Sequence, residues 1–423
     1  MAFNPEALEL VEVNVMDAIF HLIFDEQDTI KLCTMETIVK LSEILPLQLQ
    51  EQIICSLIDG LLVKDDVDRS TVLALDLIRD LSDSIQSSLI EKRFLPIMQV
   101  TYQSPNFLIR QKSVDSLAAA AASLDPFTVA EKIVPAIKTL VNDSVWGVRK
   151  SLADTLPEFS LRVTSKCREK DLTPICLKLL SDNSRWVVSS IHDTLGGFIA
   201  TFTGTSSNAS SSENLKPTSS DDVVMASASA HAVPEKLISV YIDILNTLDS
   251  DVRENEKLIQ YAFYFPGVVL ALGPRHWPRI KEIYTNMALD VQWKVRKPIA
   301  HSLHEVAKSL GSELTVSDLL PFLDQFLKDL DEVKVGVLEN FCVIMEIIAP
   351  EHREIYLTVL NDIIQQSGHH WRIRMIIAGH IKALCSLYKS SLCSQFLFPL
   401  ACKLSRDPVA KVRDKVKESV NNI

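Results

Sequence analysis

Apolar residues recur with helical spacing along most of the chain, and residues 133–159 show the pattern most plainly. Apolar side chains first follow the i, i+1, i+4, i+7, i+8 spacing of one helix face, at Ile133, Val134, Ile137, Leu140 and Val141. A second apolar face follows, at Val148, Leu152, Leu156 and Phe159. Between the two faces, Asp143 or Ser144 can accept hydrogen bonds from the free amides of a helix start. The stretch therefore predicts a hairpin of two helices.

This hairpin is one copy of a repeat. Steps of about 39 residues from Arg149 reach an equivalent position, often basic, in further copies. The positions in this register are Leu32, Thr71, Arg110, Arg149, Val188, Lys257, Arg296, Val335, Arg374 and Arg413. Such a period, with two amphipathic helices per unit, is typical of helical-hairpin solenoids. We therefore predict an all-α fold, a right-handed α-solenoid of about ten hairpins with this period.

A second fixed position, six residues before the basic one, is acidic in most repeats. The guanidinium of Arg149 is expected to reach the aspartate of a neighbouring repeat, which would build a ladder of charge-assisted hydrogen bonds along the solenoid. The candidate ladder residues are Asp143, Arg149, Asp182, Asp290, Arg296, Asp407 and Arg413. At Val188 the basic residue is replaced, so the ladder should be interrupted there. Contact with a partner protein is the alternative role of these charges.

The register breaks once, between Val188 and Lys257, where an extra segment is inserted. This segment, residues 203–232, contains nine Ser, three Thr and no aromatic residue. It can bury too little apolar area to offset its ordering entropy, and we expect it to be disordered. The chain then divides into repeats one to five (1–202), the insertion (203–232) and repeats six to ten (233–423). Ser219 and Ser220 precede two aspartates and are candidate phosphate acceptors.

Composition and motifs narrow the functional classes. The formal net charge of −11 argues against nucleic acid as a partner. The apolar runs are shorter than the roughly 20 residues of a membrane span, so no membrane association is expected. Eight cysteines without a Cys-x-x-Cys pair indicate reduced thiols in a cytosolic or nuclear protein. Catalytic, cofactor-binding and metal-binding motifs are not found, and for the His301 and His304 pair a solvent-facing helix is favoured over a metal site. We expect a protein that is not an enzyme.

Aromatic residues mark one position of the repeat. Phe107, Trp146, Trp293 and Trp371 each lie three residues before the basic position, and Trp186 lies two before it. The register places all five in the turn inside a hairpin, where they would line one edge of the solenoid. Each could pack on its neighbouring turn. Alternatively, these residues and Arg185 could bind a partner, since Trp and Arg are favoured anchors of interfaces.

Four phrases carry a resemblance to a known family: residues 142–150, 180–187, 287–297 and 326–338. With the recurrent Pro, Asp and Val-Arg positions, they resemble the HEAT repeats of the protein phosphatase 4 regulatory subunit 1 family. The resemblance covers most of residues 95–415. The family's repeats continue past the equivalent of residue 423, so this chain is expected to be a shortened paralogue, a variant or a fragment.

The resemblance implies a non-catalytic regulatory or scaffold subunit of a Ser/Thr protein phosphatase. Its partners would be the phosphatase catalytic subunit and phosphoprotein substrates, bound through the turns inside the repeats. Periodicity alone is equally compatible with a generic HEAT-repeat adaptor or transport-type scaffold that is not tied to a phosphatase.

Overall fold

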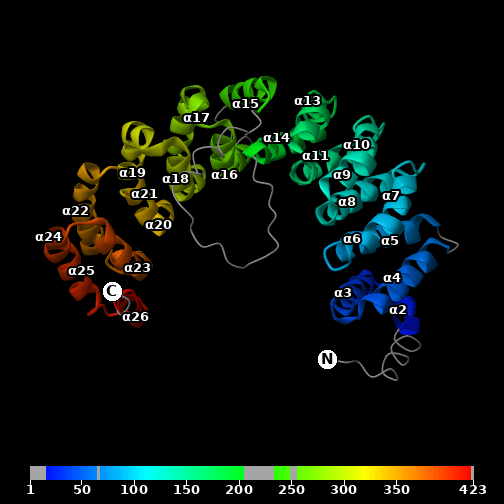
Figure 1. Cartoon of the computed structure of the whole chain (residues 1–423), viewed down its shortest axis with the longest axis horizontal. Helices are drawn as coiled ribbons and strands as arrows, with labels where there is room; N and C mark the ends of the chain where they lie inside the picture. Colours follow the sequence, from blue (N-terminus) through cyan, green and yellow to red (C-terminus); the bar gives the residue numbers. More distant parts are fainter. Residues whose placement is uncertain (1–15, 64–66, 204–232, 248–254, 421–423) are drawn as a thin grey trace, which may run out of the picture. The chain divides into compact units, whose positions relative to one another are not determined.

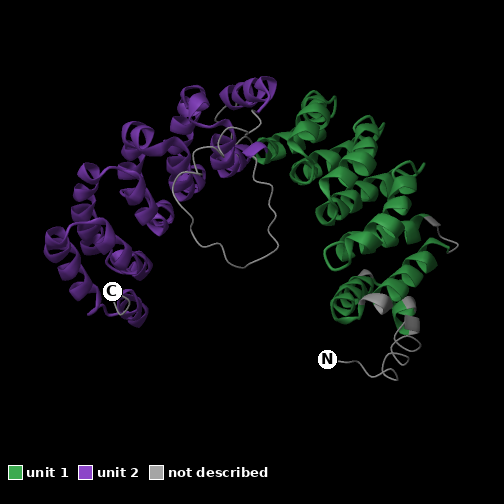
Figure 2. Ribbon diagram, viewed as in Figure 1, with its two compact units in different colours: residues 1–201, 206–213 green, residues 202–205, 214–423 purple. Residues whose placement is uncertain are grey.

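The computed structural model describes residues 16–63, 67–203, 233–247 and 255–420 (Figure 1). Every regular element in these ranges is a helix, so the predicted all-α class is confirmed. Apart from Thr203, the inserted segment lies outside the described residues, and so do Ser219 and Ser220. The helices form two compact units that meet in sequence between Thr201 and Phe202 (Figure 2).

Unit 1 consists of five successive helical hairpins. The first two are α2 (Met16–Ile23) with α3 (Asp28–Ile44) and α4 (Leu47–Leu62) with α5 (Val67–Leu81). In the next three, the second helices are α8 (Phe107–Ser123), α11 (Trp146–Leu161) and α14 (Arg185–Ala200). The first helices of these three are composite: α6, η2 and α7 (Ser87–Thr101); α9, η3 and α10 (Pro126–Leu140); and α12, η4 and α13 (Ser165–Leu180). A short turn, η5 (Thr201–Thr203), follows α14.

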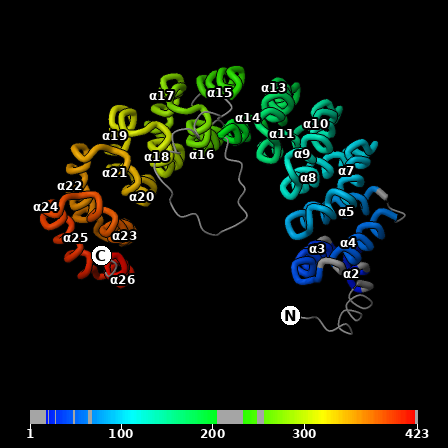
Figure 3. Tube along the Cα trace, in the orientation of Figure 1, coloured from blue at the N-terminus to red at the C-terminus, as the bar shows by residue number. Residues whose placement is uncertain are grey.

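Unit 2 continues the same organisation. It begins with α15 (Glu235–Thr247) and α16 (Asn255–Leu272), followed by η7 (Pro274–His276), α17 (Trp277–Ala288) and α18 (Trp293–Leu314). Next come η8 (Thr315–Leu319), α19 (Leu320–Phe326), α20 (Asp331–Glu339) and α21 (Phe341–Ile347). The last elements are α22 (Pro350–Gln366), α23 (Trp371–Leu387), α24, η9 and α25 (Ser390–Leu404) and α26 (Ala410–Val420). In each unit a hairpin lies beside the hairpins that precede and follow it in sequence (Figure 3).

Burial follows the predicted apolar faces. All nine apolar positions that predict the hairpin at residues 133–159 are buried, from Ile133 to Phe159. Packing of second helices against those of adjacent repeats adds further contacts between side chain and backbone. For example, the Ser116 hydroxyl of α8 donates to the Leu75 carbonyl of α5 at 2.8 Å. The Thr194 hydroxyl of α14 makes the equivalent bond to Ala153 of α11 at 2.9 Å. Each hairpin thus buries its apolar faces against itself and its neighbours.

Proline explains a recurrent irregularity of the first helices. Five first helices contain a five-residue π-helical turn, and a proline lies two residues after each turn ends. These prolines are Pro96, Pro135, Pro174, Pro321 and Pro399. Proline has no amide hydrogen for the bond to residue i−4, and its ring would clash with that carbonyl. A π-helical turn widens the backbone at this point, so the chain continues as a helix.

Candidate interaction surface

The turns of unit 1 are joined by arginine–aspartate pairs. The Arg149 guanidinium donates through Nε and Nη2 to the two carboxylate oxygens of Asp182 in the next repeat, at 2.6 and 2.8 Å. Its Nη1 donates to the Asp143 carbonyl of its own turn at 2.6 Å. Arg110 binds the carboxylate of Asp143 in the same way, at 2.6 and 2.9 Å. Each such pair, which we call a rung, therefore fixes a turn to the turn of the following repeat.

Unit 2 contains two rungs of the same geometry. Arg296 binds Asp329 at 2.7 and 2.6 Å, and Arg374 binds Asp407 at 2.6 and 3.2 Å. In all four rungs the partners are 33 residues apart. The candidate ladder residues did not include Arg110, Asp329 or Arg374. Their signal was nonetheless in the sequence, since all three occupy the charged positions of the repeat register.

Two candidate ladder residues make only backbone bonds. Arg413 donates to the carbonyls of Asp407 and Pro408 at 2.7 and 2.9 Å, and no residue in the described ranges forms an ion pair with it. Asp290 accepts a hydrogen bond from the Gln292 amide at 2.7 Å, and no residue in the described ranges forms an ion pair with it. The ladder is expected to be interrupted at Val188. The aspartate position of the following repeat, Asp251, lies outside the described residues.

The rungs hold their carboxylates in the charged form. The Arg149 guanidinium lowers the pKa of Asp182 below its usual value, and the Ser184 amide adds to this effect, although partial burial opposes both. Arg296 acts on the pKa of Asp329 in the same direction. The Asp143 and Asp182 side chains are only 7% and 9% exposed, so a partner has little access to either charge.

At one rung position of unit 2, both partners are replaced. Val335 occupies the arginine position, and Gly368 occupies the aspartate position of the next repeat. Gly368 has a φ of +40°, a conformation that favours glycine. A cleft of about 870 Å³ lies here, lined by Val335 and by the turns around Asp331 and His370. His370 Nδ1 lies 2.5 Å from Asp331 Oδ2 in the same place.

The five candidate aromatic residues all lie at starts of second helices. Phe107, Trp146, Trp293 and Trp371 are the first residues of α8, α11, α18 and α23, and Trp186 is the second residue of α14. The sequence had placed them in the preceding turn, so the structure moves them by about one residue. They are therefore anchored on the helices, next to the turns inside the hairpins. We call the surface formed by these turns and helix starts the turn edge.

Trp146 and Trp186 form an exposed aromatic pair. Their ring centroids are 6.3 Å apart and the rings are inclined by 29°, an offset stack between adjacent repeats. The side chains nevertheless remain 48% and 51% exposed. The Arg185 guanidinium lies over the Trp186 ring, 4.8 Å from its centroid. Packing on a neighbouring turn and availability to a partner, which the sequence left as alternatives, thus occur together.

Trp371 has a different environment. Arg372 and Lys411 both lie 5.5 Å from the centre of its ring. No ring contact between Trp293 and Trp371 occurs in the described ranges, and the register places Glu332 at the intervening position. Phe107 is 44% exposed at the start of α8. The structure therefore brings together Trp146, Trp186 and Arg185 but leaves the other aromatic candidates separate.

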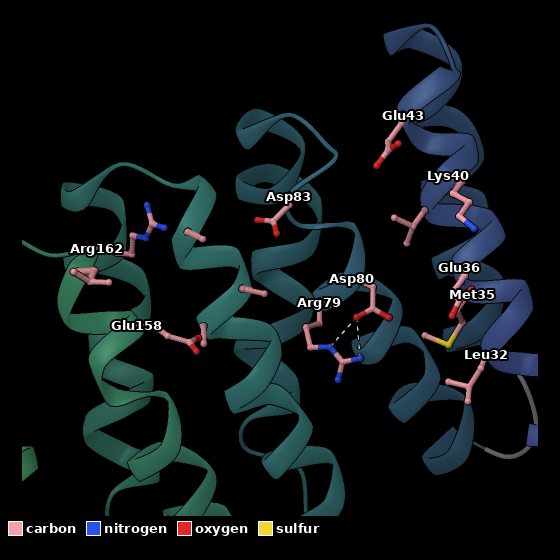
Figure 4. A pocket seen from close by; sticks show the side chains of 15 residues that line it. Leu32, Met35, Glu36, Lys40, Glu43, Arg79, Asp80, Asp83, Glu158 and Arg162 are labelled. Carbon is pink, nitrogen blue, oxygen red and sulfur yellow. Dashed lines mark hydrogen bonds and ion pairs between the residues drawn. The ribbon is translucent and has the colours of Figure 1, made fainter. Parts of the chain in front are cut away.

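A recess lies on the second helices of unit 1 (Figure 4). It has a volume of about 850 Å³, and alanines of α8 leave the room for it. Its carboxylates are Glu36, Glu43, Asp80, Asp83 and Glu158, and its cations are Lys40, Arg79 and Arg162. Arg79 is already bound by Asp76 and Asp80. Burial raises the pKa of Glu158, and the neighbouring Asp115 raises it further. Carboxylates therefore outnumber cations on this surface.

The described residues show no cluster of metal-ligating side chains and no helix long and apolar enough to cross a membrane. Stacked helical hairpins with bonded turns define the class of protein as a HEAT-type α-solenoid. In agreement, the chain is structurally similar to importin beta, with a TM-score of 0.68 at 13% identity over 98% of this chain and 53% of that chain. It is also similar to karyopherin Kap121p bound to the SUMO protease Ulp1p, with a TM-score of 0.61 at 14% identity over 98% and 43% of the two chains.

In sequence, the chain is similar to a different group of proteins. Residues 261–363 match the family model of the protein phosphatase 4 regulatory subunit 1 middle domain. The chain is 35% identical over 182 residues to serine/threonine-protein phosphatase 4 regulatory subunit 1 of Homo sapiens, and equally to that of Mus musculus. These alignments cover 43% of this chain and 19% of each relative, so the chain matches about a fifth of the length of these proteins. The predicted resemblance is confirmed.

Proposed function

We propose that this protein is a non-catalytic regulatory or scaffold subunit of a Ser/Thr protein phosphatase of the protein phosphatase 4 type. The observation that carries the proposal is the match of residues 261–363 to the regulatory subunit's middle domain, together with 35% identity over 182 residues. Its partners are a phosphatase catalytic subunit and phosphoprotein substrates, and its place in the cell is the cytosol or the nucleus.

The turn edge supports a scaffolding role. Rungs hold consecutive turns at fixed spacing, and exposed aromatic residues project from the helix starts beside them. Preorganised anchors of this kind lower the ordering cost of association. We assign partner binding to the turn edge, with Phe107, Trp146, Arg185 and Trp186 in unit 1 and Trp293 and Trp371 in unit 2.

Affinity purification of the tagged full chain from cells tests the proposal. A protein phosphatase 4 catalytic subunit should be recovered at near-stoichiometric level, and the eluate should dephosphorylate a phosphopeptide. The matched control is Phe127→Ala, which removes an aromatic side chain of unit 1 that is 74% exposed but lies away from the turn edge. It should recover as much phosphatase as the wild type.

If no phosphatase subunit is recovered while other proteins co-purify stoichiometrically, the protein is instead a general HEAT-repeat adaptor or transport-type scaffold. The periodicity and the solenoid fold are compatible with that function too, since similarity at 13% and 14% identity supports the fold alone.

A further inference from the structure

The charges of three consecutive turns in unit 1 do not balance. We call the surface formed by residues 104–110, 143–149 and 182–188 the Trp edge. It contains three arginines and two aspartates, in a chain whose net charge is −11. Arg110 pairs with Asp143 and Arg149 pairs with Asp182. Arg185 is the arginine left over, and none of the residues that the structure describes forms an ion pair with it.

The accessible charge of the Trp edge is therefore positive. Both aspartates are at most 9% exposed and their oxygens are occupied by guanidinium groups. Arg185 is exposed, and its guanidinium lies over the exposed ring of Trp186. A basic segment approaching Arg185 and the tryptophan pair would meet a like charge, and the two aspartates of these turns, Asp143 and Asp182, are already paired. An acidic segment would find an available cation.

The apolar part of the Trp edge lies directly beside that cation. Trp146 and Trp186 offer two stacked rings, each about half exposed, at 48% and 51%. An apolar side chain packed on the pair would remove much of this aromatic surface from water, which stabilises a complex. The pair is held by two helix starts, so little ordering is needed on binding.

We propose that the Trp edge binds an acidic segment of a partner protein. One apolar side chain of the segment packs on Trp146 and Trp186, and an adjacent Asp or Glu carboxylate pairs with the Arg185 guanidinium. The inference rests on the proposed function only in the identity of the partner protein, which is the catalytic subunit or a substrate. The recognition chemistry follows from the charges and rings of unit 1 alone.

Two synthetic peptides test the charge preference directly. Both contain the same phenylalanine–proline core, flanked by aspartates in one and by lysines in the other, and binding to the full chain is followed by fluorescence anisotropy. The wild type should bind the aspartate peptide at least about tenfold more tightly, and added salt should weaken this binding. Arg185→Glu should reverse the preference. Trp146→Ala with Trp186→Ala should abolish binding of both peptides.

Matched controls separate recognition from general effects. Arg162→Glu reverses a charge in the recess of the second helices, and Phe127→Ala removes an exposed ring away from the edge. Both controls should bind the aspartate peptide as the wild type does, and circular dichroism should show that every variant is folded. Equal affinity for the two peptides, or an unchanged preference in Arg185→Glu, would overturn the proposal.

Failure of this inference is distinguishable from failure of the proposed function. If the wild type recovers the phosphatase catalytic subunit from cells but shows no peptide preference, the function stands and the recognition chemistry is wrong. If the peptides bind as expected and no phosphatase subunit is recovered, the Trp edge binds acidic segments of other partners.

Discussion

The turn edges of the two units use the same rung but not the same spacing. Unit 1 has rungs between consecutive repeats, at Arg110–Asp143 and Arg149–Asp182, and its aromatic residues lie in consecutive repeats as well. In unit 2 a repeat without a rung separates Arg296–Asp329 from Arg374–Asp407. At that repeat Glu332 occupies the aromatic position, and a cleft of about 870 Å³ lies beside it.

A rung also sets the distance between neighbouring turns. Where rungs are consecutive, neighbouring turns stay close enough for Trp146 and Trp186 to stack. At one rung position of unit 2, Val335 stands where the other rungs have arginine and Gly368 stands where they have aspartate. Loss of one partner alone would leave a largely buried charge unpaired, which commonly costs more than removing the whole pair. Replacing both partners at this position therefore leaves no charge unpaired there.

The largest expected effect is the loss of an intact rung. Arg149→Ala removes the bidentate bond to Asp182 and the bond to the Asp143 carbonyl, and should lower the free energy of unfolding by about 1–3 kcal/mol. Arg296→Ala should behave alike in unit 2, because its bonds are equivalent. Urea unfolding followed by circular dichroism measures both.

Arg413→Ala is the matched control for the rung variants. Its guanidinium reaches only the carbonyls of its own turn, so its loss should cost clearly less. Equal destabilisation by all three variants would show that the bond between repeats contributes nothing beyond the bonds within a turn.

A rung can also be added at the missing position. Val335→Arg leaves an unpaired cation, and Gly368→Asp forces a side chain onto a backbone with φ of +40°, so each single change should destabilise unit 2. Together they should recover a favourable coupling energy of about 1 kcal/mol in a double-mutant cycle. Additive effects of the two changes would mean that this turn cannot adopt the rung geometry of its neighbours.

Lowering the pH is expected to have a smaller effect on the stability of unit 2. Burial lowers the pKa of His301, His304 and His380 below the usual value of about 6.5. Their contribution to stability is present above that pH and is lost as pH falls toward the folded-state pKa, since the unfolded chain then binds more protons. The urea concentration at the unfolding midpoint should therefore decrease as the pH is lowered from about 7 to about 5.

The unit 2 transition can be followed in a Trp146→Phe, Trp186→Phe background, in which the remaining tryptophans all belong to unit 2. His380→Gln is the test variant, and it should show a shallower decline than its parent. An identical decline would assign the pH dependence to other groups.

The smallest expected effect comes from removing the insertion. Residues 204–232 join two units that each have their own helical core, and loop closure costs change only logarithmically with length. Replacing this segment by a short Gly-Ser linker should leave helicity and melting temperature unchanged. A clear drop in melting temperature would show that the segment packs on the helices.

The sequence predicted the helical class and the charged positions because both depend on periodic spacing. Arg149 and Asp182 lie in a register that can be read without coordinates, and so do Arg110 and Arg374. The paired replacement at Val335 and Gly368 was visible in the same register, but the cleft it leaves was not. A cleft depends on side-chain volumes and on the left-handed backbone of Gly368, and periodicity contains neither.

The aromatic edge was predicted less completely. Trp146 and Trp186 occupy similar positions in adjacent repeats, so the sequence predicts that they lie side by side. The structure shows that their rings stack. Trp293 and Trp371 are not in ring contact within the described ranges, because two repeats separate them. The charge imbalance that leaves Arg185 unpaired required knowledge of which aspartates the other arginines bind.

The most direct test of the account is the affinity of the full chain for the phosphatase catalytic subunit or substrate that it recovers from cells, compared between the wild type and Trp146→Ala with Trp186→Ala. Loss of an anchor pair at an interface should weaken binding at least about tenfold while the helical circular dichroism signal is retained. Unchanged affinity in a folded double variant would contradict the account and place the partner on another face.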